Sequence, residues 1–117
     1  MNSASTTMVL AQAVLKTENL LGLSNTQLAT VMGLDLMSMN QIKFSAVLEP
    51  TSSQGKTGLL LIRLYQGLSA LTGGDSEWID YVMNAFNTAT NGVPTQQIQN
   101  RKGLEKVLTV VEALNNR

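Results

Sequence analysis

The stretch LSNTQLATVMGLDLMSMNQIK, residues 23–43, holds the clearest local signals in the chain. Ser24 is a favoured residue at the start of a helix, and Gln27 three positions later completes the capping box, in which each side chain accepts from the other's backbone N–H. Leu23 and Leu28 have the spacing of a hydrophobic staple across that start. The segment therefore predicts a helix that begins directly after Ser24.

A second helix should follow the first after a tight turn. We expect the first helix over Asn25–Met32 and a stop at Gly33, a residue that readily adopts the left-handed conformation. Asp35 can then cap a helix that continues through Ile42. Ala29 is small enough to let the two helices cross closely. Helix, glycine turn and helix form the arrangement called helix-turn-helix.

The outward residues of the second helix give a mixed signal for DNA binding. Asn40 and Gln41 can pair with adenine edges in the major groove. Leu36 and Met37 could contact only thymine methyl groups. Lys43 is the only base on this helix, although phosphate contacts supply most of the affinity in such complexes. Two interpretations stay open, a DNA-binding unit that uses Asn40, Gln41 and Lys43, and a helix-turn-helix that serves as a scaffold or a partner surface.

Helical spacing extends over the rest of the N-terminal half. An apolar stripe predicts a helix over Met8–Leu21, which Gly22 should end. The segment Glu49–Gly55 is rich in turn-forming residues and is the candidate boundary between subdomains. We therefore expect three parts: a disordered tail at 1–7, a helix-turn-helix-like subdomain at 8–48, and a helical subdomain at 49–117.

The segment Lys56–Leu71 is unusually apolar for a helix. Nine of the thirteen residues from Leu59 to Leu71 are apolar. An apolar arc this wide favours burial on more than one face, either as a central helix or at a dimer interface. For a dimer interface the candidate residues are Leu60, Ile62, Leu64 and Leu68.

Further helices are expected after the Gly73–Asp75 turn. Trp78 and Tyr81 lie three residues apart on the helix that Asp75 or Ser76 should cap, and they suit either core packing or contact with a partner. Pro94 fits the first position of a short helix, and a last helix should follow Gly103. Because no segment alternates like a strand, the chain is predicted to be all-α, with about seven short helices.

The composition excludes several classes of function. The chain of 117 residues has no His and no Cys, and its eight basic residues balance eight acidic ones. Disulfides, zinc fingers, cysteine nucleophiles and Ser–His–Asp relays are therefore impossible within the chain. The acidic residues do not follow the pattern of a calcium loop. We expect no enzyme, no metal and no cofactor.

Targeting signals are also not evident in the sequence. The apolar run at residues 8–15 has no basic residue before it, as a signal peptide would require, and no stretch reaches the roughly 18 apolar residues of a membrane-spanning helix. A cytoplasmic protein without membrane contact is expected. Charged residues make up 14% of the chain, against about 25% in ordinary soluble proteins, which suggests a surface covered by other proteins.

Motifs in the second half carry a family resemblance. In order along the chain they are Arg63-Leu64-Tyr65, Gly73-Gly74-Asp75, Trp78, the Asn87, Gly92 and Pro94 loop, and Gly103 with Val107. Together with the helix-turn-helix-like segment, these residues resemble the Xre/MbcA/ParS-type antitoxin family over roughly residues 24–117. The chain departs from the pattern in a longer segment between Trp78 and Pro94 and in a recognition-like helix that is poor in basic residues.

The resemblance implies one half of a type II toxin–antitoxin module. The partner would be a RES-domain toxin that consumes NAD, and the antitoxin would act as a homodimer that blocks the toxin's active site with its C-terminal region. Family members often repress their own promoter as well. The residues expected to bind the toxin are those of the last turn, Leu114, Asn115, Asn116 and Arg117. Trp78 and Tyr81 are expected as further contacts.

Two other hypotheses for the function of the chain remain beside the antitoxin. One is a helix-turn-helix transcriptional repressor without a toxin partner, and the other is a structural or adaptor protein.

Overall fold

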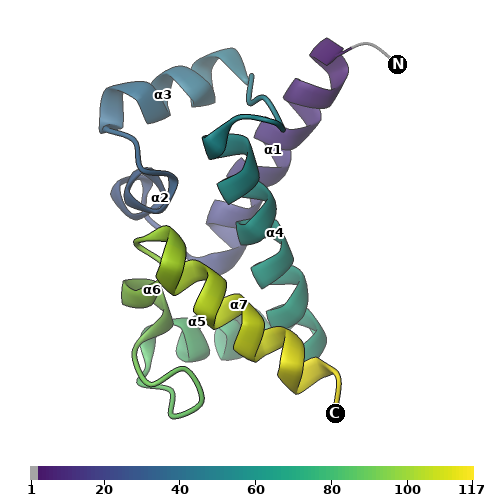
Figure 1. Cartoon of the computed structure of the whole chain (residues 1–117), viewed down its shortest axis with the longest axis vertical. Helices are drawn as coiled ribbons and strands as arrows, with labels where there is room; N and C mark the ends of the chain where they lie inside the picture. Colours follow the sequence, from purple (N-terminus) through teal and green to yellow (C-terminus); the bar gives the residue numbers. More distant parts are fainter. Residues whose placement is uncertain (1–2) are drawn as a thin grey trace.

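The computed structural model describes the backbone of residues 3–117 and the side chains of residues 6–117. Within this part of the chain there are seven helices and no strand, so the predicted all-α fold is confirmed (Figure 1). The helices are α1 (Ser3–Leu21), α2 (Asn25–Met32), α3 (Leu36–Ser45), α4 (Ser53–Thr72), α5 (Ser76–Asn84), α6 (Pro94–Gln97) and α7 (Arg101–Asn115). None of these helices is long and apolar enough to cross a membrane.

The local signals of the helix-turn-helix are confirmed in detail. The hydroxyl of Ser24 accepts from the backbone N–H of Gln27 at 3.1 Å, and the Gln27 side-chain oxygen accepts from the Ser24 N–H at 2.8 Å. Gly33 ends α2 with φ of 70°. The Asp35 carboxylate accepts from the Ser38 N–H at 2.7 Å and caps α3. The bounds of α2 are therefore those that the sequence predicts.

Helix α1 begins earlier than the sequence suggests. It starts at Ser3, so residues 3–7 of the expected disordered tail form its first turns, while residues 1 and 2 lie outside the described part. Thr7 is buried, and its carbonyl accepts from the Leu48 N–H at 3.3 Å. This tertiary contact joins the start of α1 to the segment between α3 and α4. No local sequence pattern predicts it.

Helix α4 is the central element, packed between α1 and α7 (Figure 1). Glycines on α4 let both neighbours approach closely. A methyl group added at Gly58 would lie 2.7 Å from a methyl carbon of Val14 on α1, and one at Gly67 would lie 2.6 Å from a methyl carbon of Val111 on α7. Both distances are far below van der Waals contact, so both helix crossings depend on the missing side chain.

The hydrophobic core crosses the boundary expected between residues 48 and 49. Buried side chains of α1, such as Val14, belong to the same cluster as Leu61 of α4 and Leu104 of α7. Helix α7 begins at Arg101, ahead of Gly103, because the Asn100 side chain caps it. Packing of α1 on α4 thus joins the two halves through one continuous core.

Candidate functional site

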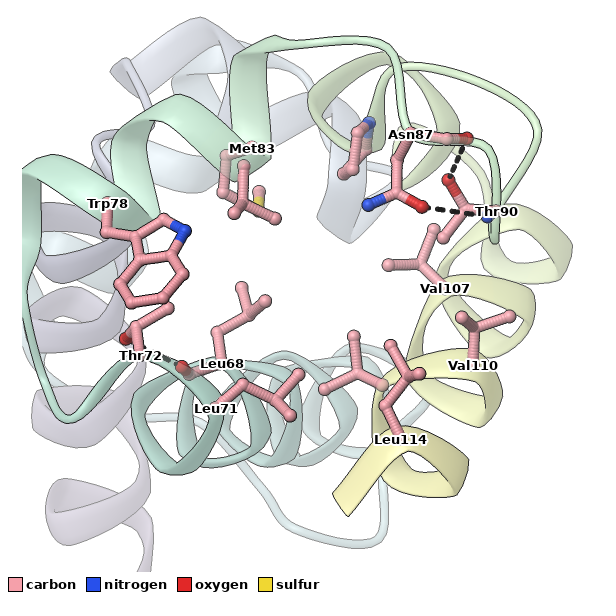
Figure 2. A pocket seen from close by; sticks show the side chains of 13 residues that line it. Leu68, Leu71, Thr72, Trp78, Met83, Asn87, Thr90, Val107, Val110 and Leu114 are labelled. Atoms are coloured by element: carbon pink, nitrogen blue, oxygen red, sulfur yellow. Dashed lines mark hydrogen bonds between the residues drawn. The ribbon is translucent and has the colours of Figure 1, made fainter. Parts of the chain in front are cut away.

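Helices α4, α5 and α7 and the loop before α6 enclose an apolar cleft of about 280 Å³, here called the C-terminal pocket. Figure 2 shows its side chains arranged around an open centre. No charged residue is among its lining residues. They are Leu68, Leu71, Thr72, Trp78, Val82, Met83, Asn87, Thr90, Pro94, Val107, Val110, Val111 and Leu114.

Trp78 forms one wall of this pocket from helix α5. The Asp75 carboxylate accepts from the backbone N–H groups of Glu77 and Trp78, at 3.0 and 3.2 Å, and so fixes the start of the helix. Trp78 is 54% exposed and Tyr81 70% exposed, which excludes the alternative that these aromatics pack in the core. The buried stripe of α5 consists of Ile79 and Met83 instead.

The last turn of α7 reaches the same pocket. Leu114 lines it opposite Trp78 (Figure 2), whereas Tyr81 lies outside the lining. The Asn115 amide donates to the Gly67 carbonyl at 3.0 Å and ties the end of α7 to α4. Asn116 and Arg117 are exposed beyond the helix. The structure therefore brings together two of the six expected toxin contacts and anchors a third within the protein.

Asn87 adds a polar group to the pocket that sequence reasoning did not identify as a site residue. Its side-chain oxygen accepts from the backbone N–H of Ala89 at 2.8 Å and of Thr90 at 3.1 Å. These contacts fix the amide orientation, because only the oxygen can accept both hydrogens. The amide nitrogen consequently points toward the open centre (Figure 2). The Asn87 to Gly92 loop was the only sequence signal near this residue.

The expected dimer residues divide into two groups. Leu64 is 0% exposed and Leu68 is 2% exposed, since both lie in the core between α4 and its neighbours. Their assignment to a dimer interface is therefore corrected, because a second copy cannot touch them. Leu60 and Ile62 are partly buried at the edge of the core. Ile62 also borders a shallow apolar hollow between α1 and α4.

The expected DNA-binding residues do not share one surface either. Asn40 and Gln41 are exposed on α3. The Lys43 ammonium instead lies 3.1 Å from the carboxylate of Glu18, a largely buried residue of α1. Lys43, which is expected among the DNA-binding residues, therefore has its charge paired within the molecule.

The outward side of α3 is apolar rather than basic. Met37 is 75% exposed and Phe44 is 95% exposed, and they flank Asn40 and Gln41 around a shallow hollow. We call these residues and Leu36 the α3 face. Phe44 was not singled out from the sequence, since an apolar residue at a helix end ordinarily finds cover in the same chain. Helix α3, which carries the α3 face, lies at one end of the long axis, and helices α5 and α7, which line the C-terminal pocket, extend toward the other (Figure 1).

Charged side chains near the two surfaces form an ion pair and a helix cap within the protein. Arg63 of α4 holds the Glu112 carboxylate of α7 with oxygen distances of 2.7 and 2.9 Å. Hydrogen bonds from Ser38 lower the pKa of Asp35, as expected for a carboxylate that caps a helix. Among the described residues no group of three or more acidic side chains could hold a metal ion. No family model matches the chain, and no curated protein matches it.

Proposed function

We propose that this chain is the antitoxin of a type II toxin–antitoxin module and neutralises a RES-domain toxin that consumes NAD. One observation carries the proposal. Trp78 of α5 and Leu114 of α7 lie 36 positions apart in the sequence but line one apolar pocket at the surface. Four motif residues of the resemblance therefore line the same pocket as the implied toxin contact Leu114: Trp78, Asn87, Pro94 and Val107.

The surroundings of the pocket suit a protein partner. Strong interfaces concentrate their energy in a few aromatic or apolar anchors surrounded by a polar rim. Here Trp78 and Leu114 supply apolar walls, and exposed Tyr81 lies on the same helix as Trp78. Asn116 and Arg117 extend past the end of α7 and can reach into a toxin's active site. Occlusion of that site requires binding alone, which agrees with a pocket that lacks acid–base groups.

The proposal includes a homodimer, for which the edge of α4 is the remaining candidate surface. Leu60 and Ile62 both keep part of their surface accessible but point to different sides of the helix. Ile62 borders the hollow between α1 and α4, together with exposed Val9 and Leu59. A second copy placed here would cover apolar side chains without disturbing the core. Light scattering of the purified chain, compared between the wild type and Ile62→Glu, tests this part separately.

Repression of a promoter is the second candidate function, and the exposure of Asn40 and Gln41 favours it. The pairing of Lys43 with Glu18 and the exposed Phe44 favour protein contact at the α3 face instead. A gel shift on the chain's own promoter at two salt concentrations separates these functions, because binding through phosphates weakens steeply with salt. No shift at low salt would remove the repressor.

The central experiment is co-expression with a RES-domain toxin encoded beside the chain's own gene. We expect restored growth and a complex that co-purifies. The double variant Trp78→Ala with Leu114→Ala should lose both, while Phe86→Ala serves as the matched control, an exposed aromatic just beyond α5 that does not line the pocket. Deleting residues 114–117 should weaken neutralisation more than folding. Growth arrest that persists with the wild-type chain would contradict the proposal.

A further inference from the structure

We propose that the C-terminal pocket is also a binding site for a small, uncharged molecule with an apolar body of about ten non-hydrogen atoms and a carbonyl-type hydrogen-bond acceptor. The inference goes beyond the toxin proposal and does not depend on it. It rests on the size of the pocket, the absence of charge in its walls and the direction of two donor groups.

The size of the pocket sets the size of the ligand. An engineered protein cavity of about 150 Å³ with apolar walls stays dry and binds benzene, which has six non-hydrogen atoms. At about 280 Å³ the C-terminal pocket is nearly twice as large, so on the same scale it holds about ten such atoms. Side chains of α4, α5 and α7 supply apolar contacts on three sides.

The donors in the wall specify the polar part of the ligand. The Asn87 amide nitrogen points into the pocket, and its orientation is fixed because the side-chain oxygen already accepts two backbone hydrogens. The indole nitrogen of Trp78 also lies on the cavity side of its ring (Figure 2). Neither nitrogen has a hydrogen-bond partner among residues 6–117. Both offer a hydrogen to a ligand that can accept it.

The other polar groups in the wall do not compete for this role. The Thr72 hydroxyl donates to the Leu68 carbonyl at 2.8 Å, and the Thr90 hydroxyl lies within 3.4 Å of the carbonyls of Asn87 and Gly92. Their hydrogens are thus used within the chain. With no charged lining residue, an ionic ligand would lose its hydration without a counter-charge. A neutral ketone, aldehyde or ester carbonyl fits this wall best.

Binding can be measured on the purified full chain without any toxin. The probes are cyclohexyl methyl ketone and isopropylcyclohexane, which have equal numbers of non-hydrogen atoms and differ in the acceptor. Trp78 is the only tryptophan, so its fluorescence and its single indole N–H resonance report directly on the pocket. We expect saturable binding of both probes, with the ketone roughly three- to tenfold tighter because of its hydrogen bond.

Three variants make the test specific. Asn87→Asp keeps an oxygen for the N–H groups of Ala89 and Thr90 but removes the donor, so the preference for the ketone should disappear. Val110→Phe should fill the pocket from its half-buried rim and abolish binding of both probes, with Leu114→Phe as a second filling variant. Val47→Phe, at an exposed position between α3 and α4, is the matched control and should bind like the wild type.

The outcomes separate this inference from the toxin proposal. Absence of saturable binding of either probe to the folded wild type overturns the ligand site, whatever the result with the toxin. A ketone preference that survives Asn87→Asp overturns the assigned donor. Normal binding with loss of toxin neutralisation leaves the inference standing, and competition between the ketone and a toxin would place a toxin side chain in the same pocket.

Discussion

Helices α3 and α4 make opposite use of their apolar residues. Nine of the thirteen residues at Leu59–Leu71 in α4 are apolar, and side chains such as Leu61 and Leu64 are fully buried in the protein's own core. Helix α3 has a weaker apolar pattern, yet Met37 and Phe44 remain exposed. The number of apolar residues in a helix thus indicates how much surface it must bury, but not whether the covering surface belongs to the same chain.

The largest expected effect tests the core role of α4. Leu64→Ala should lower the free energy of unfolding by about 2–5 kcal/mol, because it removes buried methyl groups and leaves a cavity. Phe44→Ala on the α3 face should change it by less than about 0.5 kcal/mol, as is usual for exposed positions. Urea denaturation followed by circular dichroism measures both. Equal losses would mean that the α3 face is covered within the folded protein.

The crossing of α4 and α7 can be tested through Gly67. Gly67→Ala should destabilise the protein by about 1–3 kcal/mol, because the added methyl group collides with Val111. The same substitution in a Val111→Ala background should cost much less, since the colliding methyl groups are gone. Thermal unfolding of the four proteins in this double-mutant cycle gives the coupling. Independent effects of the two substitutions would contradict the close crossing.

The Lys43–Glu18 pair connects α3 to α1. Lys43→Ala should lower stability by about 1–3 kcal/mol, because the largely buried Glu18 carboxylate loses its partner. Adding Glu18→Gln should recover part of the lost stability. Lys16→Ala, at an exposed position of α1, is the control. Chemical denaturation provides the measurement. If Lys43→Ala left stability intact but reduced binding to promoter DNA, Lys43 would be a phosphate contact after all.

The smallest effect concerns the start of α3. The pKa of Asp35 is lowered from its ordinary value of 3.8 by hydrogen bonds from Ser38. A carboxyl with a lowered folded-state pKa contributes stability above its ordinary value and loses it as the pH falls through the folded-state value. Asp35→Asn should therefore flatten the decline of the thermal midpoint between pH 5 and acid conditions. Parallel curves for both proteins would contradict this capping role.

Local signals predict the elements of the fold well. The capping residues Ser24, Asp35 and Asp75 and the stop at Gly33 are all found in the expected roles. These features depend on contacts between residues two to four positions apart, which a sequence displays directly. The start of α1 was missed because Thr7 is buried through a contact with Leu48.

The candidate site was only partly predictable. Trp78 and Leu114 were selected through the family resemblance, while their common pocket depends on how α5 and α7 pack against α4. Asn87 was missed as a site residue because the direction of its amide follows from the fold of its loop. The choice of Leu64 and Leu68 as dimer contacts was wrong because an apolar stripe does not indicate whether the surface that covers it belongs to the same chain or to a second one.

The sequence by itself determined that this protein is all-α, where α2, α3 and α5 begin, and that it lacks side chains for triad, thiol or zinc chemistry. These properties are local or compositional. Only the tertiary structure decided which apolar faces are covered, which charges are paired and which side chains meet at the C-terminal pocket. The physical reason is that burial and pairing depend on helix packing between residues tens of positions apart, where close contacts such as Gly67 against Val111 fix the geometry.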